Sequence, residues 1–262
     1  MPGELLIDRP AAGVLRLAIS NPVKRNALDR AILAAIAAQL ATLDESTRCV
    51  ILTGTDGTFS SGYDISEITA EDFAEEAEKL VAQPFCEALA ALDGAGVPTL
   101  AVLTGSAIGG GLELALSCDL RLAGDHIQLG MPPAKLGLIY SHTGLRRFLD
   151  AIGEPRTREL FLLGRYVDAG TALGWGLVNW VAEPHEVETH ALEVATQLAG
   201  NSPLSMAGNK RVLRELLHAE GALDPDVERE MLSLRTSSFQ SQDLLEGVSA
   251  FMQKRTPSWK GR

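Results

Sequence analysis

The sequence predicts an α/β body followed by a helical C-terminal region. Two short runs rich in aliphatic residues, 49–53 and 98–104, are bounded by Gly and Pro, as buried strands are. Between them, apolar residues recur every three or four positions, as on the buried face of a helix. After about residue 141 the pattern becomes almost wholly helical. This order of elements predicts an α/β core at residues 1–200 and a helical region at 201–262.

The N-terminal elements can be assigned in order along the chain. Residues 5–9 and 13–20 look like the two strands of a hairpin. A helix should follow at 28–43, where apolar residues share one face and Asp29 can cap the first turn. A further helical stretch at 70–92 begins with acidic residues that repel one another. The later amphipathic helices are predicted at 154–163, 185–200, 204–219, 225–236 and 239–255.

Composition excludes several classes of protein. The chain has 23 Lys and Arg against 34 Asp and Glu, a net charge of -11, which opposes broad nucleic-acid surfaces and anionic membranes. Three cysteines without C-x-x-C spacing support neither a disulfide framework nor a metal site. There is neither a signal-peptide pattern nor an apolar run of roughly 18 residues. We therefore expect a cytoplasmic protein without nucleic-acid or membrane partners.

The segment GSAIGGGLELALSCD, residues 105–119, carries the strongest functional signal. Its glycines at 109–111 stand at the start of a short apolar helix, where free backbone N–H groups and the helix dipole favour an anionic oxygen. Glu113 lies inside that helix, and a buried acid requires either an ion-pair partner or a catalytic task. For the glycines alone, a close-packed turn between a strand and a core helix remains the alternative.

Other motifs lack the pattern that their chemistry needs. The glycines do not form a dinucleotide or phosphate loop, and no G-x-S-x-G elbow is present. His185 and His190 are five positions apart on a predicted helix, so they would diverge rather than share a metal ion. His142 follows Tyr140 in a loop, where it is either a surface residue or a functional one.

Four ordered segments together resemble the enoyl-CoA hydratase/isomerase, or crotonase, superfamily. They are NPVKRNAL at 21–28, FSSGYD at 59–64, the glycine-rich segment at 105–119 and EGVSAFMQKR at 246–255. The resemblance runs almost from end to end of the chain. It implies a crotonase-type ββα spiral core with a helical C-terminal trimerisation region, and acyl-CoA thioesters as substrates.

The resemblance also implies a role for individual residues. The backbone N–H groups of Tyr63 and Gly110 correspond to an oxyanion hole that holds the thioester oxygen as an enolate forms. Phe251 and Lys254 correspond to positions that reach the nucleotide of a neighbouring subunit. No cofactor is implied beyond the coenzyme A of the substrate, and the assembly implied is a homotrimer or a dimer of trimers. The remaining residues implied to bind coenzyme A, with a solvated turn as the alternative for the first two, are Lys24, Arg25, Ala27, Asp64 and Ile65.

Two positions depart from the hydratase pattern. Hydratases of this superfamily use two glutamates, and Glu113 matches the first, but Pro133 stands at the second and can carry no proton. Tyr140 stands where many hydratases have a small residue, and here the loop resembles the methylmalonyl-CoA decarboxylase branch. That branch has a histidine where this chain has Tyr63. Tyr140 is therefore either a catalytic residue or a buried packing residue.

These departures favour a lyase, either decarboxylase-like or hydratase-like. Breaking a C–CO2 bond itself delivers the enolate, so a decarboxylase needs little general base. Glu113 would then be protonated, paired with a partner such as Arg121, or used as a proton shuttle. In a hydratase or an enoyl-CoA isomerase, Glu113 would be the sole acid and base. A non-catalytic acyl-CoA-binding or assembly protein is the remaining alternative.

Overall fold

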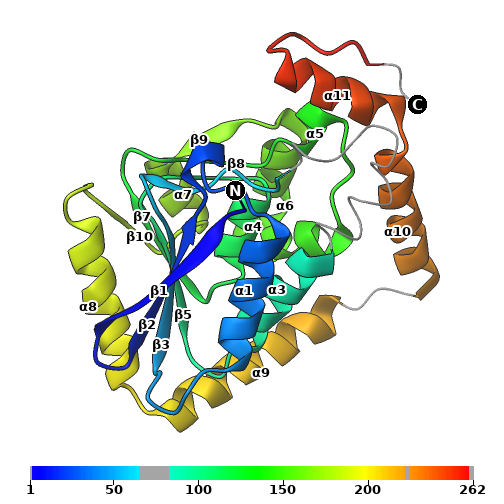
Figure 1. The fold of residues 1–262 in the computed structure, drawn as a ribbon. Helices are drawn as coiled ribbons and strands as arrows, with labels where there is room; N and C mark the ends of the chain where they lie inside the picture. The colour runs from blue at the N-terminus through cyan, green and yellow to red at the C-terminus, as the bar shows by residue number, and fades with distance from the viewer. Residues whose placement is uncertain (1, 65–82, 222–224, 260–262) are drawn as a thin grey trace.

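Two β-sheets form the body of the molecule, and helices cover them (Figure 1). The structure is a computed structural model that describes residues 2–64, 83–221 and 225–259. The larger sheet contains, in spatial order, β1 (Glu4–Ala11), β2 (Val14–Ser20), β3 (Cys49–Gly54), β5 (Thr99–Leu103), β7 (Leu120–Gly124) and β10 (Trp180–Ala182). The smaller sheet contains β4 (Thr58–Ser60), β6 (Ser106–Ile108), β8 (Gln128–Gly130) and β9 (Tyr166–Asp168).

The chain alternates between the two sheets in a repeated ββα unit. β3, β5 and β7 enter the larger sheet in parallel, and each is followed by a short strand, β4, β6 or β8, in the smaller sheet. Helices α3 (Gln83–Gly94) and α4 (Gly110–Leu116) close the first two units, and α5 (Pro133–Leu136) with α6 (His142–Leu163) follows the third. This order is the spiral expected from the sequence. Its consequence is that loops following different strands meet at one edge.

The larger sheet is buried on both faces. Along β3, Val50 and Leu52 face one core cluster, while Cys49 and Ile51 face another, because neighbouring side chains of a strand point to opposite faces. The second cluster is completed by the apolar face of α8 (Val187–Gly200), which packs across the sheet in Figure 1. Burial on both faces explains why the sequence of this strand is continuously apolar.

Most N-terminal expectations are confirmed. β1 and β2 pair as an antiparallel hairpin. Helix α1 (Arg30–Ala41) begins after Asp29, whose carboxylate accepts a hydrogen bond of 2.9 Å from Ile32 N. The described part of the helix predicted at 70–92 is α3, and residues 70–82 lie outside the described residues.

Two expectations for the second half are incomplete. The helix predicted at 154–163 is only the second part of α6, which begins at His142 and bends at Gly153, where φ is 74°. Gly153 and Pro155 interrupt the helical pattern, so the preceding turns were missed. The region after residue 141 is almost wholly helical, as expected, but two short strands were not predicted: β9 and β10, with α7 (Ala169–Trp175) between them, return the chain to both sheets.

The last three helices carry much of the exposed apolar surface. They are α9 (Pro203–Gly221), α10 (Pro225–Phe239) and α11 (Gln242–Met252), and Figure 1 shows α10 and α11 on the side opposite α8. The division of the chain at residue 200 stays a prediction. None of the helices within the described ranges has the length and hydropathy required to cross a bilayer. The exposed apolar side chains of α9 are Leu204, Val212, Leu213, Leu216 and Leu217.

Candidate active site

A glycine turn places the start of α4 directly against a second loop. Gly109 has φ 57° and ψ -125°, which turns the chain sharply from β6 into α4. A Cβ atom on Gly111 would lie 2.7 Å from the backbone oxygen of Ser60. Glycine is therefore required at 111, because Ser60, the last residue of β4, occupies the space of a side chain.

The same loop brings the backbones of Tyr63 and Gly110 together. Gly62 has φ 98°, and a Cβ atom there would lie 3.4 Å from Gly110 N. The loop pairs with Leu28, whose N–H donates to Gly62 O at 2.8 Å and whose carbonyl accepts from Asp64 N at 3.0 Å. Neither of these two bonds uses the N–H group of Tyr63. Gly110 is the first residue of α4, so its N–H has no partner within that helix.

Glu113 and Tyr140 meet in the core beside this turn. Glu113 is only 2% exposed, and the Tyr140 hydroxyl donates a hydrogen bond to its Oε2. Tyr140 comes from the segment between α5 and α6, and its ring packs edge-on against Phe161 with centroids 5.4 Å apart. Tyr140 is therefore a buried packing residue that also bonds Glu113, and its catalytic role stays a prediction.

Burial changes the acidity of Glu113, Tyr63 and Tyr140. Burial raises the pKa of Glu113, while the Tyr140 hydrogen bond and the charges of Arg147 and Arg235 oppose that rise. Burial also raises the pKa of Tyr63 and of Tyr140 well above 10, and the nearby Glu113 carboxylate adds to both. Both phenols therefore keep their protons at neutral pH.

Arg147 is the cation next to Glu113. Its Nε lies 3.8 Å from Glu113 Oε1, which is an ion-pair distance and too long for a hydrogen bond. Its other two nitrogens donate to Asp93 at 2.9 and 2.6 Å. The sequence suggested Arg121 as a partner of Glu113, and this is wrong. Arg121 instead donates to the carbonyls of Leu177 and Cys118 at 2.7 and 2.8 Å.

Pro133 and the segment after it are held by the last helices. Pro133 is buried and begins α5. Gly137 ends α5 with φ 70°, and a Cβ atom there would lie 2.7 Å from the backbone of Asp243 in α11. Ser238 Oγ at the end of α10 accepts from Ile139 N at 3.2 Å. α10 and α11 therefore fix the segment that carries Tyr140. His142 turns toward α10, with Nε2 3.5 Å from Glu228.

The candidate coenzyme A residues fall into two groups. Lys24 ends a short 3-10 helix, Pro22–Lys24, and its Nζ lies 2.6 Å from Asp64 Oδ2. Arg25 follows with φ 52°, and its carbonyl accepts from Ser61 N at 3.0 Å, so these two loops are joined. Ala27 is buried, and Ile65 lies outside the described residues. The other group is at the end of α11, where Phe251 is 62% exposed and Lys254 follows with φ 53°.

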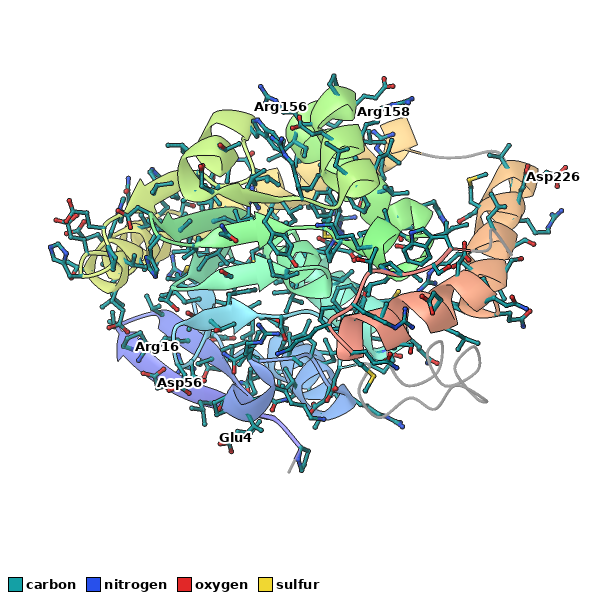
Figure 2. All side chains as sticks on the ribbon, turned by 90° about the horizontal axis from the view of Figure 1, so that it is seen from above. Glu4, Arg16, Asp56, Arg156, Arg158 and Asp226 are labelled. Atoms are coloured by element: carbon teal, nitrogen blue, oxygen red, sulfur yellow. The ribbon has the colours of Figure 1, made fainter. Side chains whose placement is uncertain are left out.

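A surface hollow of about 520 Å³ lies elsewhere, between α8 and the larger sheet. Its charged residues pair with one another, since Arg16 contacts Asp8 at 2.7 Å and Glu188 at 2.8 Å. Figure 2 shows Arg16 and Asp56 at the margin of the molecule formed by the first strands. The Glu113 site, where a buried acid lies beside the glycine turn, is the stronger candidate for an active site.

Comparison with known proteins identifies the family. The family model for enoyl-CoA hydratase/isomerase matches residues 9–262. The chain belongs to the enoyl-CoA hydratase/isomerase family. The 2,3-dehydroadipyl-CoA hydratase of Escherichia coli (strain K12) is 33% identical over 99% of both chains. A carnitinyl-CoA dehydratase of Salmonella arizonae is 33% identical over 95% of both chains.

The solved structures agree with the family and with its fold. A methylmalonyl-CoA decarboxylase in complex with 2-nitronate-propionyl-CoA superposes with a TM-score of 0.90, at 26% identity over 98% of both chains. The ββα spiral is therefore the crotonase-type fold of this family. The family acts on acyl-CoA thioesters, and its relatives here include both hydratases and a decarboxylase.

Arg147, Asp93 and Gly144 are the residues that sequence reasoning missed. A Cβ atom on Gly144 would lie 2.6 Å from the Tyr140 ring and 2.9 Å from Glu113 Oε1. The adjacent pair Arg146-Arg147 gave no signal, because neither arginine falls on the apolar face that Leu145, Phe148 and Ile152 define in the sequence. Asp93, the partner of Arg147, is 54 positions away, and no sequence pattern joins the two.

Proposed function

We propose that the chain is a lyase that removes CO2 from a 2-carboxyacyl-CoA thioester. The observation that carries the proposal is the Tyr140 hydroxyl bonded to a buried Glu113, in a chain where Pro133 stands at the position that the second carboxylate occupies in hydratases. The similarity to methylmalonyl-CoA decarboxylase supports it. The reaction uses no cofactor beyond the coenzyme A that the substrate carries.

The first step is loss of CO2. The bond between C2 and the carboxylate breaks, and its electron pair moves onto the thioester oxygen as an enolate. We assign the N–H groups of Tyr63 and Gly110 as donors to that oxygen. The support is that the loop before Tyr63 lies against the start of α4, since a Cβ atom on Gly62 would be 3.4 Å from Gly110 N. One such donor contributes about 3 kcal/mol to the transition state.

The second step returns a proton to C2. The carbanion carbon of the enolate is strongly basic, and the Tyr140–Glu113 pair is the proposed donor. The pair then regains one proton from solvent, so one proton is consumed for each CO2 released. Pro133 suits this reaction, because a carboxylate at that position would repel the carboxylate of the substrate.

Hydration is the second candidate. The raised pKa of Glu113 brings this acid toward the range in which one group can take and return a proton near neutral pH. The hydratase and dehydratase relatives support the same reading. Isomerisation of an enoyl-CoA would use Glu113 in the same way, and an acyl-CoA-binding protein without turnover would use only the oxygen-binding amides.

Substrate preference distinguishes these reactions, and Pro133→Glu should change it. We expect the wild type to decarboxylate methylmalonyl-CoA with a higher kcat/KM than it hydrates crotonyl-CoA. Pro133→Glu should move that ratio toward hydration, because the new carboxylate can hold water and repels a substrate carboxylate. Mass spectrometry of the acyl-CoA products measures both reactions.

A matched variant, Pro133→Ala, separates the new charge from the loss of proline. Removing proline frees the backbone before Ala134 and Lys135. If Pro133→Ala changes the ratio as much as Pro133→Glu, the charge is not responsible. A wild type that hydrates crotonyl-CoA efficiently and releases no CO2 would instead favour the hydratase candidate.

The proposed assembly is a homotrimer or a dimer of trimers. The support from this chain is the row of exposed apolar side chains on α9, which a neighbouring subunit would cover. In such an assembly the exposed Phe251 and Lys254 would reach the coenzyme A nucleotide of a neighbour. Lys24, Arg25, Ala27, Asp64 and Ile65 would bind the coenzyme A of their own subunit.

Coenzyme A should bind more weakly as salt rises, and Lys254→Ala should weaken binding about three- to tenfold at low salt. The reason is that Lys254 would act as a point charge near a phosphate on the surface, where salt screens the attraction. Titration calorimetry measures both effects. The control is Arg158→Ala, an exposed cation paired with Glu154 at the margin of the molecule in Figure 2. Equal weakening by both variants would remove Lys254 from the site.

A further inference from the structure

Arg147 combines a fixed position with one unused donor. The guanidinium is held by two hydrogen bonds to Asp93 Oδ1 and Oδ2, which fixes its plane. Its third nitrogen, Nε, is buried and lacks a hydrogen-bond partner among the described residues. Leaving such a donor without a partner is unfavourable, so its position calls for an explanation.

The nearest acceptor of that donor is Glu113. Nε and Glu113 Oε1 are 3.8 Å apart, while Oε2 already accepts from Tyr140. A movement of about 1 Å would convert the ion pair into a charge-assisted hydrogen bond. The two oxygens of Glu113 would then face one neutral donor and one cation.

The groups around Glu113 come from five parts of the fold. Arg147 belongs to α6, Asp93 to α3 and Arg235 to α10, where Arg235 lies 5.1 Å from the Phe239 ring centroid. Two tyrosine hydroxyls complete the set. The groups that affect the pKa of Glu113 are therefore Tyr140, Arg147, Arg235 and Asp93, while Glu113 in turn raises the pKa of Tyr63.

Burial alone would favour the neutral acid, since an isolated carboxylate loses its hydration. Arg147 opposes this with a full positive charge at ion-pair distance. Asp93 acts in the opposite direction, because it is a second negative charge and partly neutralises Arg147. The balance between Arg147 and Asp93 decides which form of Glu113 the site contains.

We propose that Arg147, oriented by Asp93, is a positioning residue that keeps Glu113 ionised and turned toward Tyr140 in the resting enzyme. This inference rests on the proposed role of Glu113 as the group that exchanges protons at C2. It assigns Arg147 an effect through Glu113 rather than contact with substrate. It also explains how a site can hold both a buried carboxylate and a substrate carboxylate, because Arg147 compensates the first.

The direct test measures the protonation of Glu113 without substrate. Infrared spectra across a pH series contain the C=O band of the protonated acid, and Glu113→Gln identifies which band is Glu113. Arg147→Met should move the appearance of this band to higher pH, because the stabilising cation is lost. Asp93→Asn should move it to lower pH, because Arg147 remains and the competing negative charge is removed.

Opposite shifts distinguish electrostatic control from general damage to the fold. Arg158→Met serves as the control, an exposed arginine of the same helix whose partner is Glu154 at 2.8 Å. If Arg147→Met does not fold, the double variant Asp93→Asn/Arg147→Met leaves no unpaired charge and should retain an upward shift. A Glu113 band at unchanged pH in folded Arg147→Met or in the double variant would overturn the proposal.

A second readout follows proton transfer at carbon. Exchange of the C2 hydrogens of propionyl-CoA in D2O requires Glu113 as a base, whichever lyase reaction the enzyme performs. Its rate should fall about tenfold in Arg147→Met at the acid end of the profile and recover as pH rises. If the wild type exchanges no C2 hydrogen but the Glu113 band shifts as expected in the variants, the result counts against the proposed function alone. If the wild type exchanges C2 hydrogens but the Glu113 band of Arg147→Met does not shift, the result counts against the role of Arg147 alone.

Discussion

Glu113→Gln is expected to lower hydration of crotonyl-CoA and C2 hydrogen exchange of propionyl-CoA by about two to four orders of magnitude. Glutamine keeps the shape of the side chain and can still meet Tyr140 and Arg147, but it cannot take up or release a proton. Decarboxylation should fall much less, because bond cleavage itself produces the enolate. Steady-state kinetics with each substrate measure the three losses.

This prediction has a matched control, and two outcomes would contradict it. Glu154→Gln is the matched change on the surface, where this residue is paired with Arg158, and it should leave all rates unchanged. Equal losses with every substrate would contradict the division between proton transfer and CO2 release. Unchanged exchange in Glu113→Gln would remove Glu113 from the chemistry altogether.

The sequence predicted the elements whose patterns are local. The aliphatic-rich run of β2, the continuous apolar run of β3 and the spacing of apolar residues in α1 are each set within one segment. The cap at Asp29 is equally local, because the carboxylate meets an N–H only three positions away. Such local patterns can be recognised without knowledge of the rest of the fold.

The smaller sheet was missed for a physical reason. Its strands β4, β6, β8 and β9 each contain three residues, which is too short for any periodicity to be recognised. Their stability comes from pairing between distant segments, as between Leu129 and Val167. Only the tertiary fold supplies those partners.

The candidate site divides in the same way. Gly109 and Glu113 belong to one segment, and the glycine turn with its buried acid was recognisable there. Tyr140 lies 27 positions from Glu113, and it was singled out only through the resemblance of its loop. The Arg147–Asp93 pair had no such guide, because it forms through packing of α6 near α3.

Gly144→Ala is expected to reduce turnover about 100-fold while leaving the protein folded. A Cβ atom at 144 would lie 2.6 Å from Tyr140 Cε1, 2.9 Å from Glu113 Oε1 and 2.9 Å from Ser141 Oγ. Both members of the hydrogen-bonded pair must therefore move, and a displacement of about 1 Å is enough to produce such a loss. Kinetics with the preferred substrate measure kcat, and the Glu113 infrared band reports whether the pair has changed.

Stability should respond differently from activity in this variant. Overpacking destabilises by about 1–3 kcal/mol, and replacing glycine within a helix offsets part of that by about 0.5–1 kcal/mol. Gly174→Ala provides the matched control, since Gly174 is an exposed glycine of α7 with no atom within 4 Å of a new Cβ. The control should gain stability and keep full activity. Wild-type turnover in Gly144→Ala would show that the contact between Tyr140 and Glu113 is not needed in its present geometry, and both tyrosine and glutamate would then have to act independently.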